Sequence, residues 1–415
     1  MSASDSSGPR GGVAFTHPSF RDFFLARCFV VSAVEMQSVA VGWQIYEITR
    51  RPLDLGLVGL AQFLPGILLF LIAGHAADRF DRKRLIVACY AGYAACSAFL
   101  LVFALRGGHS VAPIYAVMVL LGIVRSFSGP VTRAIMPQLV PEEHFQNAVA
   151  WNASAFQGAT ILGPAAGGII YAAFQGPAGV YATALASGVI AFSSMARVRP
   201  ESKPRPRKQF NLAEVFAGLR YIWREKIILG SISLDFVAVL LGGAVALLPV
   251  YARDILRTGP WGLGLLRCAQ GIGAATMAVL IAHRPLRRRA GAAMLWCVAG
   301  FGAFTVLFGI SRNFVLSFCA LLLVGAADTV SVIVRGILVQ VATPDEMRGR
   351  VNAVDMIFIG ASNQFGEFES GITAQWFGTV PAVVIGGIGT LVVTALWTWI
   401  FPGLRKIDDL NNFEG

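Results

Sequence analysis

The sequence predicts an all-α membrane protein with twelve spans, arranged as two similar bundles of six helices. Of its 415 residues, 56% are hydrophobic and only 14% are charged, whereas soluble domains carry about 25% charged residues. Apolar runs recur along the whole chain, and each is long enough to cross a bilayer as a helix. In addition, the second half of the chain repeats features of the first. Together these observations predict a polytopic membrane protein with an internal repeat.

The apolar runs give the expected spans in chain order. We predict them at residues 23–48, 55–73, 85–105, 112–140, 148–174, 178–196, 228–251, 262–282, 290–310, 314–341, 351–377 and 382–400. Residues 197–208 contain six cations and three prolines, a composition that excludes a span and indicates a linker. Residues 211–226 read as an amphipathic helix lying along the membrane surface.

These spans predict five regions. Residues 1–18 form an N-terminal tail that is rich in Ser and Gly and expected to be disordered. Residues 19–196 form the first six-helix bundle, 197–226 the basic linker with its amphipathic helix, and 227–402 the second bundle. Residues 403–415 form the C-terminal tail. The first apolar run is too long, and begins too late, for a cleavable signal peptide.

The repeat has a period of about two hundred residues. The segment that begins at Arg133 matches the segment that begins at Arg335, with a one-residue insertion. Asn147-Ala148-Val149 then matches Asn352-Ala353-Val354. Parallel repeats of this kind place the substrate site between the bundles, near the middle of the membrane.

The net charge of +11 is spread over short connections between spans. The positive-inside rule accounts for it, so the predicted partner is the lipid bilayer and not nucleic acid. The same rule makes the basic linker and both termini cytoplasmic. The connections at residues 50–54 and 106–110 then face outward by alternation.

The chain offers no enzyme chemistry. Its six cysteines lie in or near apolar runs without paired spacing, so we interpret them as small core residues, neither disulfides nor metal ligands. No Gly-rich loop ends in Gly-Lys-Ser or Gly-Lys-Thr, and no nucleophile–base set is present. We therefore expect no enzymatic activity, no cofactor and no metal.

Charged residues inside the spans are the candidate functional residues. A charge at this depth is costly and usually faces a water-filled cavity or a partner. A carboxylate in such a pocket takes up a proton readily, and protonation can bias alternating access. Structural pairing of Arg125 with Glu35 or Asp328 is the open alternative, and we expect Arg133 and Arg335 to act as structural anchors. The candidates for the central cavity are Glu35, Arg125, Asp235, Asp328, Glu367 and Glu369.

A charged stretch at residues 74–84 separates the second and third spans. It resembles the loop between helices two and three of major facilitator superfamily transporters, with Asp81 where that family usually has Gly. The resemblance implies that Asp78 pairs with nearby cations and with the positive end of span eleven, closing the cytoplasmic side. Asp355, near that helix end, competes for this role. The matching positions are Gly74, Asp78, Arg79, Arg82 and Lys83.

Two further stretches resemble motifs of the same superfamily. Arg125 and Gly129 match a span-four pattern associated with proton coupling, although Ser128 replaces the commoner Gln. Residues 159–168 are similar to the span-five motif of drug–proton antiporters, with Ala159 in place of its first Gly. Close helix packing without functional meaning is the alternative, because small residues four apart let backbones touch. The motif residues in span five are Gly163, Pro164, Gly167 and Gly168.

The segments 344–352 and 363–371 resemble the branch that contains bacterial enterobactin-type siderophore exporters. Leu234-Asp235 with Gly242-Gly243, and the segment 262–267, fit the same branch. The resemblance implies a monomeric transporter of the bacterial inner membrane that uses protons to export a small organic molecule, siderophore- or drug-like. Proton-coupled import and lipid flipping are the alternatives within this fold. A membrane sensor without transport activity is the alternative from another class, although neither tail is long enough for an output domain.

The predicted topology can be tested at Ser202 in the basic linker. We expect a cysteine at this position to be protected from an impermeant thiol reagent added to intact cells, because the six surrounding cations oppose translocation. The same cysteine should react once the membrane is permeabilised. Labelling in intact cells would place the linker outside and contradict the predicted orientation.

Overall fold

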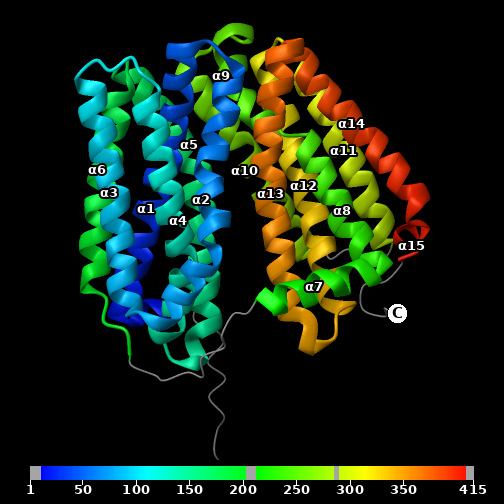
Figure 1. Ribbon diagram of the computed structural model, residues 1–415, viewed down its shortest axis with the longest axis horizontal. Helices are drawn as coiled ribbons and strands as arrows, with labels where there is room; N and C mark the ends of the chain where they lie inside the picture. The colour runs from blue at the N-terminus through cyan, green and yellow to red at the C-terminus, as the bar shows by residue number, and fades with distance from the viewer. Residues whose placement is uncertain (1–10, 202–211, 285–288, 408–415) are drawn as a thin grey trace, which may run out of the picture.

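In the computed structural model the chain forms two helical bundles that lie side by side (Figure 1). The structure describes residues 11–201, 212–284 and 289–407. The N-terminal bundle comprises α1 (Pro18–Thr49), α2 (Pro52–Arg79), α3 (Arg82–Leu105), α4 (Ala112–Ile135), α5 (Phe145–Ala173) and α6 (Pro177–Arg197). The C-terminal bundle comprises α8 (Lys226–Leu241), α10 (Gly259–His283), α11 (Ala290–Ile310), α12 (Phe314–Val341), α13 (Asp345–Phe377) and α14 (Thr379–Ile400).

Shorter elements connect these helices. Helix α7 (Leu212–Arg224) leads into α8, and α15 (Pro402–Arg405) follows α14. Single 3-10 turns occur at η1 (Val13–Thr16), η2 (Met136–Gln138) and η3 (Glu142–His144). After α8 the chain continues through η4 (Ala244–Leu247), α9 (Leu248–Val250) and the π-helical turn η5 (Tyr251–Ile255). Within the described residues, ten helical segments are long and apolar enough to cross a membrane. Helices α5 and α13, which are long but richer in polar residues, complete the predicted twelve.

The predicted seventh span over residues 228–251 lies within the apolar segment Lys226–Ile255, but its helix is interrupted. Helix α8 ends at Leu241, and the chain then passes through Gly242 and Gly243 before the turn η4. A Cβ added to Gly243 would lie 2.7 Å from the backbone of Gly366 in α13. The interruption therefore brings the backbones of two spans together.

The connection between α2 and α3 is shorter than the sequence predicts. Helix α2 continues through the charged stretch to Arg79, and only Phe80 and Asp81 separate it from α3. The Asp81 carboxylate accepts a hydrogen bond from the Arg84 backbone N–H at 2.9 Å and caps α3. Its φ of −59° lies in the ordinary range, so this position has no need of the usual glycine.

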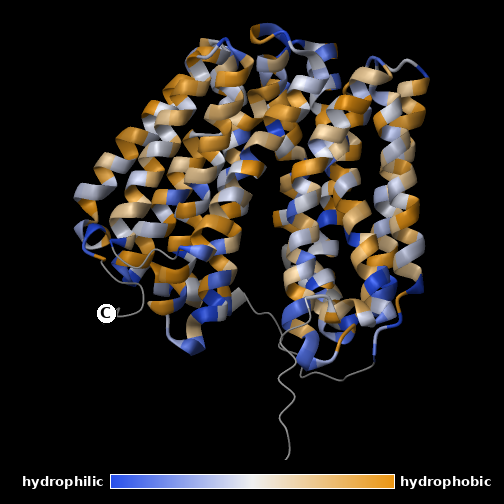
Figure 2. Ribbon diagram, turned by 180° about the vertical axis from the view of Figure 1, so that it is seen from behind, coloured by the Kyte–Doolittle hydropathy of each residue, from blue (hydrophilic) through white to orange (hydrophobic). Residues whose placement is uncertain are grey.

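The outer surface of both bundles is apolar (Figure 2). Large hydrophobic side chains on it include Leu68, Leu162 and Val315, which are 68%, 68% and 66% exposed. Soluble monomers rarely expose many large hydrophobic side chains in continuous patches. Hydrocarbon is the solvent that fits such a surface.

The two bundles meet along two seams, α2 with α13 and α5 with α10. In the α5–α10 seam, a Cβ on Gly168 would lie 2.9 Å from the Gly264 Cα atom. In the α2–α13 seam, a Cβ on Gly371 would lie 3.1 Å from the Gly56 Cα atom. At these points both seams are backbone-to-backbone contacts that only glycine permits, while elsewhere in the α2–α13 seam the rings of Phe63 and Phe365 pack edge to face.

Both seams lie towards one end of the molecule, which we call the clamp end; it carries Arg50 and the turn η5. The opposite end, with α7 and the turn at Phe80 and Asp81, is called the basic end. Added Cβ atoms on Gly66, Gly74 or Gly158, all towards the basic end, would meet no atom within 4 Å. Figure 1 shows the bundles converging at the clamp end and diverging towards the basic end.

The seam can be tested with a matched pair of glycine variants in α5. Gly168→Ala should lower the melting temperature of the purified protein, because overpacking typically costs about 1–3 kcal/mol. Gly158→Ala should leave it unchanged or raise it slightly, since its Cβ enters open space and Ala favours helix. Equal shifts in the two variants would contradict the proposed contact.

Candidate transport site

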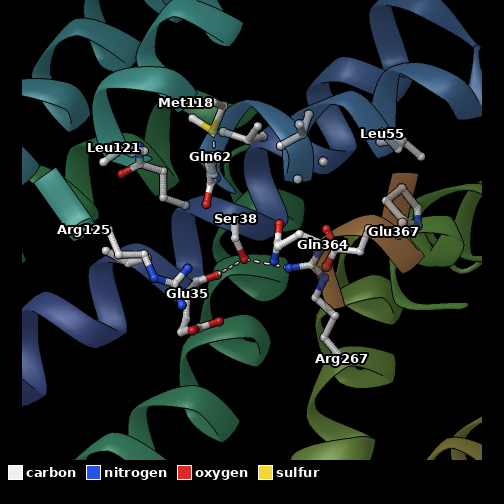
Figure 3. Close-up of a pocket in the computed structure, with 18 of the residues that line it drawn as sticks. Glu35, Ser38, Leu55, Gln62, Met118, Leu121, Arg125, Arg267, Gln364 and Glu367 are labelled. Atoms are coloured by element: carbon white, nitrogen blue, oxygen red, sulfur yellow. Dashed lines mark hydrogen bonds between the residues drawn. The ribbon is translucent and has the colours of Figure 1, made fainter. Parts of the chain in front are cut away.

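A cavity of about 190 Å³ lies between the two bundles, near the middle of the spans (Figure 3). Helices α1, α2, α3 and α4 supply one wall, and α10, α13 and residues 246–249 supply the other. Its uncharged polar lining comes from Gln37, Ser38, Gln62, Tyr93 and Gln364. We call it the first cavity.

Four ionisable side chains line the first cavity, two from each bundle. Glu35 and Arg125 belong to the N-terminal bundle, and Arg267 and Glu367 to the C-terminal bundle. Among the residues that the structure describes, none of the four lies within 4 Å of an oppositely charged group. Each bundle thus presents one acid and one base across a space that they do not close by direct pairing.

Arg267 makes the polar contact that crosses this space. Its guanidinium donates a hydrogen bond to the Ser38 hydroxyl at 2.7 Å (Figure 3). Its Nε atom is buried and has no hydrogen-bond partner. Residues 262–267 carried only the resemblance to the siderophore-exporter branch, and Arg267 was not among the predicted site residues. The available signal was a lone cation inside a predicted span, at residues 262–282.

A second cavity of about 330 Å³ lies mainly within the C-terminal bundle. Asp235, Asp328, Arg335 and Glu367 line it, together with amide and hydroxyl groups from α5, α10 and α13. Glu367 lines both cavities and so stands at their boundary. The carboxylate of Asp328 has no hydrogen bond or ion pair to any other described residue.

The second cavity contains a buried ion triad. The Arg335 side chain is only 2% exposed and bridges Asp235 at 3.3 Å and Asp355. Removing one member of such a group leaves an uncompensated buried charge and costs about 3–5 kcal/mol. This geometry fits the anchoring role predicted for Arg335, and it assigns Asp235 and Asp355 to the same structural unit.

Three expectations for the site residues need correction. Asp328 lines the second cavity, so it does not share one cavity with Glu35 and Arg125. Glu369 lines neither cavity; its carboxylate accepts a hydrogen bond from the Thr373 hydroxyl at 2.8 Å, because it lies about 200° around α13 from Glu367. Asp355 pairs with Arg335 and does not mark the start of span eleven, because α13 begins ten residues earlier, at Asp345.

The motif residues of α5 lie at helix contacts. Added Cβ atoms on Gly163 and Gly167 would press against Glu35 and Met36 of α1 at 2.6 and 2.8 Å. Gly168 lies in the seam with α10, and Pro164 lies inside the helix. These positions hold α1, which carries Glu35, close to α5.

The residues of the predicted cytoplasmic latch lie at the basic end. Arg79 is exposed at the end of α2, and Gly74 lies one turn earlier. Arg82 donates a hydrogen bond to the Ala134 carbonyl at 3.1 Å, tying α3 to α4. Lys83 follows in the first turn of α3. The side chain of Asp78 lies outside the described part of the structure, so its predicted pairing stays a prediction.

At the clamp end, a set of polar contacts joins the bundles. The Tyr46 hydroxyl donates to Asp254 at 2.5 Å, and Arg50 pairs with the same carboxylate at 3.4 Å. Arg253 pairs with Glu47 at 3.3 Å. We call these five residues the clamp.

Neighbouring aromatic side chains support the clamp. The Tyr171 hydroxyl donates to Glu47 at 3.0 Å, and the Arg253 guanidinium lies 5.4 Å from the Trp43 ring centroid. Arg253 and Asp254 are consecutive in the π-helical turn η5. Their side chains therefore bind two different residues of α1 and hold this end closed.

Comparison with known proteins decides the family. Residues 12–413 match the family described as transmembrane secretion effector. The chain belongs to this family. It is a multi-pass membrane transporter of the major facilitator superfamily and not an enzyme.

Curated relatives match over nearly the whole chain. The enterobactin exporter EntS of Shigella boydii serotype 4 (strain Sb227) is 26% identical over 398 residues, covering 94% of each protein. The enterobactin exporter EntS of Escherichia coli O139:H28 (strain E24377A / ETEC) shows the same identity and coverage.

Solved transporter structures share the fold. The POT family transporter PepTSo matches with a TM-score of 0.71 at 10% identity, covering 94% of this chain and 99% of that one. A bacterial homologue of ferroportin, solved in an inward-facing state, matches with a TM-score of 0.69 at 14% identity, with coverages of 94% and 98%. At these identities the likeness shows the fold of this transporter and no more.

The clamp predicts a shift in the balance between closed and open forms of this end. Asp254→Asn removes the charge that binds Tyr46 and Arg50. We expect it to raise the ratio of open to closed forms by a factor of about 1.4 to 5, because partly exposed pairs are worth about 0.2–1 kcal/mol. The open fraction can be measured as the distance between spin labels on cysteines placed at the exposed positions His109 and Arg312, one in each bundle.

A matched control is Asp54→Asn. Asp54 also lies towards the clamp end, but its carboxylate accepts from Tyr115 of the same bundle. It should leave the label distances unchanged. If the clamp does not hold this end closed, Asp254→Asn and Asp54→Asn will give the same distances between the spin labels.

Proposed function

We propose that this transporter uses the proton gradient to export a small organic molecule, siderophore- or drug-like, across a bacterial inner membrane. The observation that carries the proposal is a set of carboxylates inside the spans that contact no basic side chain among the described residues. They line the cavity between the bundles and the cavity within the C-terminal bundle, and they are Glu35, Asp328 and Glu367. Charge at this depth is costly, so such carboxylates exchange protons readily.

The orientation follows from charge. The basic end carries Arg79, Arg82, Lys83 and Arg84 in and around one two-residue turn, and positive charge next to spans marks the cytoplasmic side. The clamp end then faces outward. With the bundles joined at the clamp end, the described conformation is the one that admits substrate from the cytoplasm, with both termini on that side.

In this proposal, transport occurs because closure alternates between the clamp end and the basic end. In the described form, the clamp and the glycine seams hold the outer side together. When the clamp opens and the basic end closes, the first cavity becomes accessible from outside. Proton uptake from the more acidic outer side then favours return to the form described here, and proton release to the cytoplasm favours the outward form. One monomer is sufficient for this cycle.

Export is favoured over import by two observations. The enterobactin exporters match over 94% of the chain, and the α5 motif that resembles drug–proton antiporters lies in the contacts of α5 with α1 and with α10. The charged lining of the first cavity also fits a polar molecule better than the acyl chains of a lipid. A siderophore such as enterobactin is therefore the first substrate to test.

The coupling proposal predicts the phenotype of Asp328→Asn and Glu35→Gln. In proteoliposomes with an imposed gradient of about one pH unit, each variant should lose about tenfold in uphill enterobactin accumulation, because each proton that crosses such a gradient supplies about 1.4 kcal/mol. Binding or passive exchange of enterobactin should remain measurable. Glu369→Gln, on the same helix as Glu367 but outside both cavities, should transport like the wild-type protein.

The structural alternative predicts a different result. If Asp328 and Glu35 only stabilise nearby cations, their variants should lose melting temperature and yield, and should not specifically lose coupling. Variants that fold normally and still concentrate enterobactin by using the pH gradient would end the proposal for these positions.

A further inference from the structure

Arg267 faces two kinds of acceptor on the same helix. It donates to the Ser38 hydroxyl of α1, and Glu35 lies three residues earlier on α1. Side chains three apart lie on neighbouring turns of one helix face. The Ser38 hydroxyl itself donates to the Glu35 carbonyl oxygen at 2.9 Å. The Glu35 carboxylate lines the same cavity as the guanidinium and is an alternative acceptor on α1, whereas Glu367 is an acceptor within the C-terminal bundle.

The choice between these acceptors depends on protonation. An ionised carboxylate accepts from a guanidinium more strongly than a hydroxyl does, and a protonated carboxyl loses most of this advantage. Glu367, on α13, offers a second carboxylate in the same cavity. Arg267 can therefore bind Ser38 most readily when both glutamates are protonated.

The other groups around Arg267 do not supply a competing charge in contact with it. Helix α4 contributes the cation Arg125, α3 the phenol Tyr93 and α2 the uncharged Gln62. Residues 246–249 contribute apolar atoms, and Asp328 of α12 lies on the second cavity. From α5, which packs against α10, Gln157 and Thr160 are uncharged. Glu35 and Glu367 are thus the two titrating acids of the first cavity.

We infer that Arg267 is the positioning residue that converts the protonation state of Glu367 into the closure of the outer side. With Glu367 protonated, Arg267 binds Ser38 of α1 and joins the two bundles across the first cavity. With Glu367 ionised, Arg267 turns to this carboxylate of its own bundle, the contact with Ser38 is lost, and the clamp end opens more readily. This inference rests on the proposed proton-coupled export. Proton binding then favours the form that is closed to the outside, as export in exchange for protons requires.

The test uses full-length protein in lipid nanodiscs, without substrate. Spin labels at His109 and Arg312 report the open fraction of the clamp end, on a background in which the six native cysteines are replaced by alanine. In the wild-type sequence, the ratio of open to closed forms should rise at least about fivefold between about pH 6 and about pH 8. Arg267→Gln should reduce that change to less than about twofold.

Two further variants separate a positioning role from a merely structural one. Ser38→Ala should raise the open fraction at low pH, because the protonated form loses its contact, while the guanidinium remains. Arg267→Lys should retain a pH response, because it keeps one positive charge. Arg133→Gln is the matched control, since it removes an exposed α4 cation that lines neither cavity. Its open fraction should change with pH as that of the wild-type protein does.

The outcomes are distinguishable from those of the function proposal. A wild-type profile that does not respond to pH counts against proton coupling itself. A wild-type profile that responds, together with an unchanged response in Arg267→Gln, overturns the role of Arg267 and leaves proton-coupled export intact. An unchanged open fraction in Ser38→Ala would overturn it equally.

Discussion

The cost of placing charge in a hydrocarbon solvent determines much of this structure. The bilayer offers no water to solvate a carboxylate or a guanidinium, so each must find a partner or a cavity. Arg335, Asp235 and Asp355 take the first course and form a buried triad. Glu35, Arg125, Arg267 and Glu367 take the second and surround a space between the bundles. The first group ties α8, α12 and α13 of the C-terminal bundle together, and the second lines a space that its members do not close by direct pairing.

Apolar packing cannot bring two such bundles together specifically, because lipid chains are as apolar as the helices. The joining contacts are accordingly of two other kinds. Glycines at positions such as Gly168 and Gly264 allow backbones to touch. At the clamp end, where the spans reach water, Asp254 and Arg253 bind residues of α1. Dispersion at short range and charge at the surface together account for closure at this end.

The fold was predictable from sequence because bilayer thickness constrains the length of every span. The predicted bounds of the spans at 290–310 and 314–341 equal those of α11 and α12. The break after Leu241 was not predictable from apolarity, since Gly242 and Gly243 are apolar themselves and their effect depends on the tertiary contact with Gly366. The length of α2 was misjudged because charged residues were assumed to end the helix, whereas a helix that leaves the membrane can continue in water.

The sequence indicated which residues are candidates, but it did not indicate how their side chains lie relative to one another. Depth along a span can be counted, so the sequence placed Glu35, Arg125 and Asp328 near mid-span, and each of them lines a cavity. The direction of a side chain around its helix requires knowledge of the neighbours, which is why Glu369 was included wrongly and Asp328 was assigned to the wrong cavity. Arg267 was missed because its role depends on Ser38, a residue from the other bundle that carries no charge.

The glycine seams have a consequence for motion. Helices that pack through large side chains interlock, and they must withdraw ridges from grooves before they can tilt. At Gly168 with Gly264 and at Gly56 with Gly371, the α5–α10 and α2–α13 seams present bare backbone on both sides. At these points there are no ridges to withdraw, so the geometry permits one helix to tilt on the other while the backbones stay in contact.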